Sequence, residues 1–494
     1  MTLRQSLISS TFWLSVGNAL NQIFSIVVFA ILSRLMEPME FGIVAFAVIF
    51  IDVTGVVAWA GVGDAIVRRD PMDDVFSSTA LWVNIFLATV LFAFLSVVLA
   101  PGVERLGYED IQPVITVLAL MLIINSCDTV FSATLRRDFS YRTIAIRGML
   151  SNFVSGLLSI CLASAGAGVW ALVAQRVFAV AIQFTVTLTA VKWRPKLVFN
   201  KHYAREILTF AISVMGAQFL NQLNGHVTGM ILGVFAGPTA LAIYRTGSRF
   251  LSSLTQLIIV PIQQPVLSAF ASLPREKWPE AFLRIVQTTA LIAFPAYLGA
   301  SVISPEITAI LFGPKWAASA TVMALLAPMI GATVFDFILA PTLIGIGRGK
   351  LLLFISGVSV LVSATMALAT VKYGPDIVAL GQTLGAYIRI LIVIPIARQV
   401  TGIGFWSLLK SIFVPLTASF MMAACLYGVR ALWISELTPA YRLVILGGLG
   451  IVIYGLFILM FGRKMLGNLT SGIGPLLPGR LHRILVSLSG TRKV

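Results

Sequence analysis

The chain has 494 residues, of which 58% are hydrophobic and only 11% are charged, and its mean hydropathy is +0.97. Such a composition excludes a water-soluble globular protein, because too few polar residues remain to cover a surface in contact with water. The net charge of +16 would suit a nucleic-acid-binding protein. The basic residues are spread over alternating loops, however, so we expect no nucleic-acid partner.

The predicted elements are long apolar helices. A helix of about 20 apolar residues crosses roughly 30 Å of hydrocarbon, and only helices satisfy their own backbone hydrogen bonds there. The first apolar run is too long for a signal peptide and carries polar residues, so we predict that it stays as a helix. The sequence predicts an all-α integral membrane protein with fourteen such helices, at about 9–35, 39–61, 75–100, 111–135, 143–165, 169–191, 207–235, 240–271, 281–303, 317–344, 351–371, 377–398, 409–431 and 440–461.

Two of these helices and their following turns are similar in sequence. Residues 12–46 align without gaps with residues 212–246, and eight of the 35 positions are identical, including the tripeptide Leu-Asn-Gln at 20–22 and 220–222. Polar residues shared by apolar helices favour a duplicated unit of about 200 residues over chance agreement. Internal repeats are typical of transporters, whose substrate sites lie where the repeats face each other.

The repeat predicts how the chain is divided. Each repeat has six helices, so both have the same orientation and form two lobes related by a pseudo-twofold axis along the membrane normal. We predict an N-lobe at 1–192, a cytoplasmic linker at 193–206, a C-lobe at 207–400, two extra helices at 401–462 and a cytoplasmic tail at 463–494. The tail forms either a short helix on the cytoplasmic leaflet or a loosely ordered segment.

The distribution of basic residues predicts the orientation. The side that holds the N-terminus carries 25 of the 35 Lys and Arg residues, among them Arg136 and Arg147. The opposite side carries eight, among them Arg245 and Arg249, and the remaining two lie within helices. By the positive-inside rule the first side is cytoplasmic, so we expect both termini in the cytoplasm and an even number of crossings.

Amide side chains within the apolar helices are candidates for lining a cavity. A polar group in hydrocarbon faces protein or water, because an unsatisfied amide there costs several kcal/mol. Spacings of three and four residues place these amides on one helical face. They either line a central hydrophilic cavity or bond neighbouring helices, a contact often worth only about 0.6 kcal/mol per pair. The candidates for substrate binding are Asn18, Asn21, Gln22, Gln218, Asn221 and Gln222.

Charged residues within apolar spans are scarce and usually functional. Arg176, Arg249 and Arg389 are candidates for binding an anion in the same cavity. Asp128 and Asp336 occupy similar positions in the fourth and tenth helices and are candidates for coupling transport to protons or sodium. The alternative for Arg249 is a position near the interface, where a long side chain reaches water.

The remaining polar residues and the cysteines do not indicate a catalytic site, a metal site or a disulfide framework. Asp52 also lies in an apolar helix, and a lone helix histidine such as His226 is more often hydrogen-bonded than a proton carrier. The three cysteines are scattered in apolar helices, where a thiol behaves as a small hydrophobe. No group of residues has metal-ligand spacing, and no loop has room for a catalytic domain. We therefore expect no cofactor, no metal and no enzymatic activity.

Several segments together resemble a known family. They are SRLMEPMEFGIVAFAVIFI, GVGDAIVRRD, LRRDFSYRTIAIRG, GAGVWALVAQR and LFGPKWAAS. As a set they resemble the signatures of the bacterial polysaccharide transporter family, which belongs to the multidrug/oligosaccharidyl-lipid/polysaccharide flippase superfamily. The resemblance covers about residues 5–400, which is nearly the whole predicted twelve-helix body.

The resemblance implies two six-helix lobes around a cavity with alternating access. It also implies translocation of undecaprenyl-pyrophosphate-linked oligosaccharide across the bacterial inner membrane for exopolysaccharide synthesis. Lipid-linked oligosaccharide and membrane lipids are then the partners, with a polysaccharide polymerase and a chain-length regulator as candidate protein partners. The subgroup that it resembles most handles colanic acid or succinoglycan, and we expect succinoglycan.

Two other functions compete with this interpretation. A cation-coupled multidrug exporter of the same superfamily would have a cavity dominated by acidic residues, whereas cationic residues are at least as prominent here. A membrane-embedded polysaccharide polymerase would need a sizeable outer loop with catalytic residues, whereas the longest outer loops have about a dozen residues. Both alternatives are less favoured by the residues.

Overall fold

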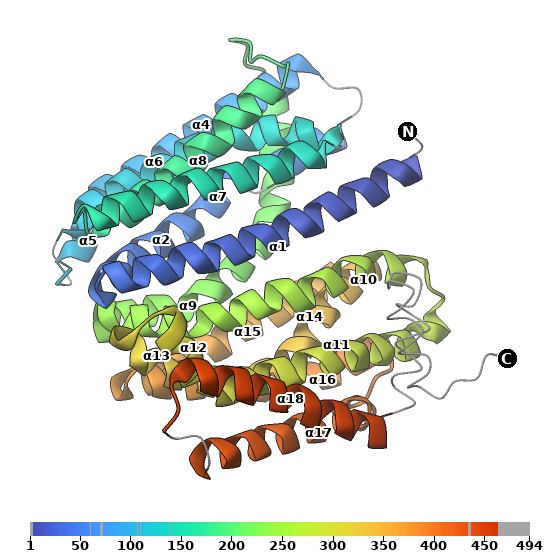
Figure 1. Cartoon of the computed structure of the whole chain (residues 1–494). Coiled ribbons are helices and arrows are strands. Elements are labelled where there is room, and N and C mark those ends of the chain that lie inside the picture. The colour runs from blue at the N-terminus through green and yellow to red at the C-terminus, as the bar shows by residue number, and fades with distance from the viewer. Residues whose placement is uncertain are drawn as a thin grey trace. The chain divides into compact units, whose positions relative to one another are not determined.

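The computed structural model describes residues 3–462 except 60, 70–72, 106, 109, 139 and 433–435. The regular structure of this part of the chain is helical throughout (Figure 1). Within it, twelve helical spans are long and apolar enough to cross a membrane. The chain is therefore an all-α, multi-pass membrane protein, as its composition predicts. The predicted tail at 463–494 lies outside the described residues.

The helices of the first half begin close to the predicted positions. Their bounds are α1 Leu3–Leu35, α2 Pro38–Trp59, α3 Val62–Arg68, α4 Asp74–Phe94, α5 Ala100–Glu104, α6 Ile111–Arg137, α7 Tyr141–Ser164, α8 Val169–Ala190 and α9 Lys201–Leu254, with a π-helical turn at 95–99 between α4 and α5.

Local chemistry explains where two of these helices begin. Pro38 is the first residue of α2, where the missing N–H of proline costs nothing. The Glu40 carboxylate accepts a hydrogen bond from the Glu37 N–H at 2.8 Å and so satisfies a donor at the helix start. At α4, the Asp73 carboxylate accepts from the Val75 N–H at 2.8 Å.

Helix α9 joins two of the predicted helices. It runs through 54 residues, but Gly237 has non-helical angles, with φ at 85° and ψ at 176°, and Pro238 follows it. The backbone therefore bends here, because a left-handed φ suits glycine and proline cannot continue the hydrogen-bonding pattern. The bend separates a first arm at 201–236 from a second arm at 238–254, close to the predicted division.

The second half is interrupted more often than predicted. Its helices are α10 Val260–Ser272, α11 Trp278–Val302, α12 Ser304–Leu311, α13 Ala317–Leu326, α14 Ile330–Gly345, α15 Gly349–Thr370, α16 Pro375–Thr401, α17 Phe405–Leu432 and α18 Pro439–Phe461. The helix predicted at 317–344 is broken by a 3₁₀ turn at Ala327–Met329, which contains Pro328. The short helix α12 lies where a loop was predicted, and Pro305 stands in its first turn.

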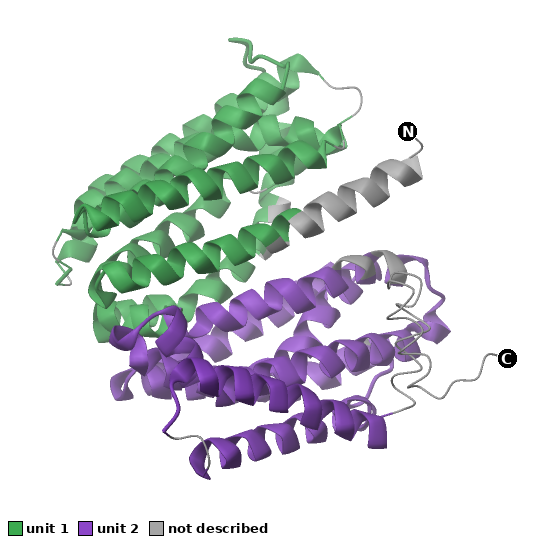
Figure 2. Ribbon diagram, viewed as in Figure 1, with its two compact units in different colours: residues 1–245 green, residues 246–494 purple. Residues whose placement is uncertain are grey.

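The chain forms two compact units, residues 1–245 and 246–494 (Figure 2). In the first unit, α7 packs along α1 and α8, α6 packs against α8 and α4, and α2 packs against α6. In the second unit, α11 packs against α17 and α14, α16 packs against α15 and α13, and α17 packs against α18. The units divide in the second arm of α9, beyond the predicted linker at 193–206.

Packing of the linker and of the first arm of α9 explains the position of this boundary. The Lys196 N–H donates to Ser78 Oγ at 3.0 Å, and the Asn200 N–H donates to Thr79 Oγ1 at 3.2 Å, so the linker backbone is bound to α4. Next along the chain, Ile207 joins a buried core that also contains residues of α3, α4 and α6. The first arm of α9 therefore belongs to the first unit.

Candidate functional site

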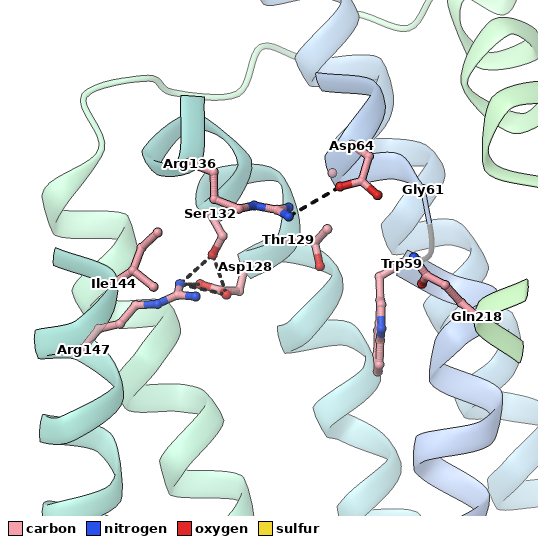
Figure 3. Close-up of a pocket in the computed structure, with 11 residues that line it drawn as sticks. Trp59, Gly61, Asp64, Asp128, Thr129, Ser132, Arg136, Ile144, Arg147 and Gln218 are labelled. Carbon is pink, nitrogen blue, oxygen red and sulfur yellow. Dashed lines mark hydrogen bonds and ion pairs between the residues drawn. The ribbon is translucent and has the colours of Figure 1, made fainter. Parts of the chain in front are cut away.

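The first unit contains a polar pocket of about 370 Å³ (Figure 3). It lies at the ends of α2, α6 and α7 where the basic residues gather, which is the end predicted to face the cytoplasm. The lining combines paired charges with small polar groups and one large aromatic ring. It comprises Trp59, Gly61, Gly63, Asp64, Asp128, Thr129, Ser132, Arg136, Ile144, Arg147 and Gln218.

Arg147 and Asp128 form the centre of the pocket. Nη1 of Arg147 lies 3.0 Å from Oδ1 and 3.1 Å from Oδ2 of Asp128, and it also donates to Thr187 Oγ1 at 2.6 Å. The Ser132 hydroxyl donates to Asp128 Oδ2 at 2.8 Å and also contacts Arg147. The two charged side chains are only 13% and 14% exposed. This burial makes the pair costly to break, since removing one partner leaves an uncompensated charge.

The guanidinium of Arg147 is held from one end. All of its contacts with the described residues are made by Nη1. A guanidinium has five N–H donors in a rigid plane, so the remaining donors are available to a ligand in the pocket. An oxyanion such as a phosphate is the ligand that this fork-shaped group binds best.

A second ion pair and a tryptophan complete the lining. Nη1 of Arg136 lies 3.4 Å from Oδ1 of Asp64. Gly63 makes this possible, because a Cβ at that position would lie 2.5 Å from Nη2 of Arg136. A Cβ on Gly55 would likewise meet the Trp59 ring at 2.1 Å, so Gly55 lets the indole lie along α2. In Figure 3, Trp59 and Gln218 lie across the pocket from Arg147.

Of the amides predicted on the first helix, Asn21 contacts another helix. Asn21 Oδ1 accepts a hydrogen bond from Asn152 Nδ2 at 3.2 Å, and Asn21 lines a groove between α1 and α7 that is otherwise apolar. Asn18 is exposed, and Gln22 is half-buried. The hydrogen bond of Asn21 joins two helices, which is the alternative to lining a cavity.

The amides predicted on the first arm of α9 have different surroundings. Gln218 lines the polar pocket. Asn221 is exposed, and Nε2 of the half-buried Gln222 lies 3.4 Å from Nε2 of His226. The structure therefore places one of the six predicted amides in the pocket.

The predicted cations are dispersed. Arg389 pairs with Asp336 in the second unit, where the two side chains are 11% and 23% exposed. Arg249 is half-buried in the second unit, and its carbonyl accepts from Ser253 Oγ at 3.0 Å. Arg176 is exposed on α8 and acts electrostatically on Asp52 and His226 of the first unit. The coupling role predicted for Asp128 and Asp336 stays a prediction, and both carboxylates are paired with arginine.

The sequence patterns do not single out the central arginine of the pocket. By sequence alone, Arg147 is one of many basic residues on the side predicted to be cytoplasmic. A signal was present, because a carboxylate such as Asp128 inside an apolar helix needs a counter-charge, and Arg147 stands near the start of the next helix. Arg245 is likewise predicted as an outer-loop residue, whereas it hydrogen-bonds to His226 inside the first unit.

The described residues hold no group of three or more His, Cys, Asp or Glu that could bind a metal ion. The pocket lining offers arginine, carboxylate, amide, hydroxyl and aromatic groups. Arginine and amide groups of this kind suit a polar, anionic ligand.

Comparisons with known proteins agree with a membrane transporter fold. Among solved structures, the lipid II flippase MurJ in an inward closed conformation has a TM-score of 0.75 at 14% identity, over 93% of this chain and 99% of that one. An inward-facing multidrug resistance MATE family transporter has a TM-score of 0.63 at 16% identity, over 77% of this chain and 94% of that one. At these identities the likeness shows the fold.

The sequence relatives are proteins of polysaccharide synthesis. The succinoglycan biosynthesis transport protein ExoT of Rhizobium meliloti is 24% identical over 456 residues, which are 89% of this chain and 90% of that protein. The teichuronic acid biosynthesis protein TuaB of Bacillus subtilis is 26% identical over 344 residues, or 66% and 68% of the two chains. The family model described as "Polysaccharide biosynthesis protein" matches residues 31–321, more than half of the sequence. The chain therefore belongs to the polysaccharide biosynthesis protein family.

Proposed function

We propose that the protein is a flippase that moves lipid-linked oligosaccharide repeat units across the bacterial inner membrane for exopolysaccharide synthesis. The observation that carries this proposal is a polar pocket, containing the anchored Arg147, in a bundle of membrane-length helices. The chain also resembles a lipid II flippase in fold and a succinoglycan biosynthesis transport protein in sequence. The succinoglycan transport protein among them supports a succinoglycan-type repeat unit.

The chemistry of the substrate suits the pocket. An undecaprenyl pyrophosphate headgroup carries oxyanions, which arginine binds with two parallel hydrogen bonds. Sugars need hydroxyl and amide groups in place of water, while the lipid tail stays in the bilayer. Within the pocket, Arg147 is the proposed anion-binding residue and Gln218 a proposed sugar contact. The other predicted residues lie outside this lining and stay separate predictions: Arg176, Arg249 and Arg389 for the anion, and Asn18, Asn21, Gln22, Asn221 and Gln222 for the sugar.

The proposal includes a topology. Fourteen crossings, with α9 spanning the membrane twice around Gly237, place both termini in the cytoplasm. Two six-helix lobes related by a pseudo-twofold axis would then expose the pocket to each side in turn. Membrane lipids surround the bundle, and a polysaccharide polymerase and a chain-length regulator are the proposed protein partners.

Deletion of the gene, with analysis of the lipid-linked sugars, tests the proposal. Cells without the protein should accumulate a lipid-linked oligosaccharide on the cytoplasmic leaflet and lose surface polysaccharide. Restored export on re-expression is the expected result. Export of dyes with unchanged surface polysaccharide would instead favour a multidrug exporter, and accumulation of unpolymerised units on the outer leaflet would favour a polymerase.

A substitution in the pocket links the function to Arg147. Arg147→Lys keeps the charge beside Asp128 but loses the rigid fork, so polysaccharide export should fall about tenfold, equivalent to about 1.4 kcal/mol. Arg142→Lys is the matched control, because Arg142 is an exposed residue near the start of the same helix. Membrane levels of both variants should equal those of the unaltered protein. Equal export by both variants would remove Arg147 from the site.

A further inference from the structure

A second polar cluster lies in the first unit, away from the pocket. His226, in the first arm of α9, lies between two charged groups from other segments. Its Nδ1 is 2.9 Å from Nη2 of Arg245 in the second arm of α9, and its Nε2 is 3.4 Å from Oδ2 of Asp52 on α2. Arg176 on α8 acts electrostatically on both His226 and Asp52. His226 is only 9% exposed.

The arginine determines which nitrogen of the ring carries the proton. A guanidinium can only donate, so Nδ1 of His226 must accept from Arg245 and holds no hydrogen. The hydrogen of the neutral ring is therefore on Nε2, which lies 3.4 Å from the Asp52 carboxylate. The side-chain amide of Gln222, also 3.4 Å from Nε2, then turns its oxygen rather than its nitrogen toward the ring. The contacts thus assign the tautomer, and the predicted hydrogen-bonded role of His226 agrees with them.

The surrounding glycines provide the room for this arrangement. A Cβ on Gly229 would lie 3.2 Å from Nη2 of Arg245, so a glycine one turn from His226 allows the guanidinium to approach α9. A Cβ on Gly42 would lie 1.9 Å from the Pro238 carbonyl oxygen, so α2 meets the start of the second arm closely. The two arms of α9 and α2 are therefore packed around the His226 ring.

The cluster has a surplus of positive charge before any proton binds. Asp52 carries one negative charge, and Arg176 and Arg245 carry two positive charges. Tyr244, beside Arg245, is the other titratable group that acts on that arginine. A second hydrogen on His226 would place an N–H against the N–H of Arg245 and add a third positive charge, in a region where charges interact strongly.

We propose that His226 and Asp52 form a proton-binding site in which a bound proton displaces Arg245. The imidazolium loses its acceptor for Arg245 and gains a charged pair with Asp52. A hydrogen bond between the second arm of α9 and the first is then lost, in the segment that follows the bend at Gly237. The chain enters the second unit directly after Arg245, so proton binding alters the segment that leads into that unit.

The proton bound at His226 and Asp52 would be the coupling ion of the proposed transport. Only the transport assay described below rests on the proposed function. Asp52 differs from the carboxylates predicted for coupling. Asp128 and Asp336 lie against arginines, which cannot release a proton, whereas Asp52 faces an imidazole, which can bind one.

Nitrogen NMR of the purified full-length protein in lipid tests the site without a substrate. The chain has three histidines, so ¹⁵N-imidazole labelling gives few signals, and a His226→Gln sample identifies that of His226. We expect the Nε2–H tautomer near neutral pH. Arg245→Gln should produce a mixture of tautomers, and Arg142→Gln should change nothing. A predominant Nδ1–H tautomer, or an unchanged signal in Arg245→Gln, would overturn the proposal.

A transport assay tests the consequence. In membrane vesicles supplied with lipid-linked oligosaccharide, an imposed pH gradient should change the transport rate of the unaltered protein. His226→Gln and Asp52→Asn should each lose this response, and a normal response in both variants would overturn the proposal. If the unaltered protein moves no lipid-linked oligosaccharide, the proposed function fails, and the NMR result then tests the contacts of His226 independently of transport.

Discussion

Single residues show how this membrane protein accommodates buried carboxylates. An ionised carboxylate in an apolar surrounding is costly unless a positive or hydrogen-bonding partner lies beside it. Four such residues in the described helices each have a partner from another helix. The pairs are Asp128 with Arg147, Asp336 with Arg389, Asp52 with His226, and Glu306 with Arg430 and Arg442.

The Asp336 and Arg389 pair predicts a double-mutant result. Arg389→Ala leaves the carboxylate of Asp336 without its partner, so the protein should lose about 3–5 kcal/mol of stability. Asp336→Asn combined with Arg389→Ala should recover most of this loss, because no charge remains buried. Thermal unfolding in detergent measures both effects. If Arg389 also binds the substrate anion, the double variant will regain stability but not export, whereas recovered export would assign Arg389 a structural role only.

At the scale of elements, Glu306 connects the last two helices to the rest of the second unit. Its side chain is 2% exposed, and Oε1 lies 3.3 Å from Nε of Arg430 on α17 and 3.8 Å from Nη1 of Arg442 on α18. Arg430 also donates to the Val302 carbonyl at 3.0 Å. The buried side chains of Val302, Met422 and Leu446 form a core beside these contacts. The two helices predicted as an addition to the lobe are thus packed into the second unit.

This connection predicts the effect of neutralising Glu306. Glu306→Gln leaves two arginines without their shared counter-charge, so the unfolding temperature should fall and the segment between α17 and α18 should become more sensitive to protease. Glu280→Gln, at an exposed position of α11, is the control and should behave like the unaltered protein. Equal protease sensitivity of the two variants would contradict an anchoring role.

The segment at 193–206, predicted to be a cytoplasmic linker, predicts a pH dependence of stability. A hydrogen bond from the Tyr203 hydroxyl, together with backbone N–H groups and Arg69, holds the pKa of Asp73 below its ordinary value of 3.8. The stabilisation is complete above that ordinary value and is lost as the pH falls through the lower folded-state pKa. Between about pH 5 and pH 2, the unaltered protein should lose more stability than Tyr203→Phe, as followed by unfolding temperature. Parallel curves for the two proteins would refute this coupling.

At the scale of the whole molecule, the proposed topology can be tested with reporter fusions. Green fluorescent protein fluoresces in the cytoplasm, and alkaline phosphatase is active outside it. Fourteen crossings predict cytoplasmic fusions after Lys196, Gly402 and Val494 and outer fusions after Gly166 and Gly374. Active alkaline phosphatase after Val494 would place the C-terminus outside the cytoplasm and would exclude the proposed arrangement.

Two prolines at corresponding positions of the predicted repeat each begin a helical segment. Pro38 begins α2, and Pro238, which aligns with it in the repeat, begins the second arm of α9 after the bend. Both prolines follow a long apolar helix that carries the tripeptide Leu-Asn-Gln. The symmetry of two six-helix lobes stays a prediction, because the compact units divide at Arg245 and the first arm of α9 packs in the first unit.

The sequence by itself determined the class of the protein and most of its helices. Apolar length and the helix-breaking effect of proline are local properties, so segments such as 111–135 and 169–191 could be predicted within a few residues of α6 and α8. Local rules also located the bend near Pro238. They failed where a short helix is stabilised by its surroundings, as in α3 and α12.

Only the tertiary structure decided which polar residues act together. Asp128 and Arg147 are 19 residues apart, and Asp336 and Arg389 are 53 apart, so no periodicity within one helix pairs them. Helix packing also turned Asn21 toward Asn152 and brought Arg245 to His226. A charge inside an apolar helix indicates that a partner exists, but the partner depends on which helices touch, and this is fixed by packing between segments distant in sequence.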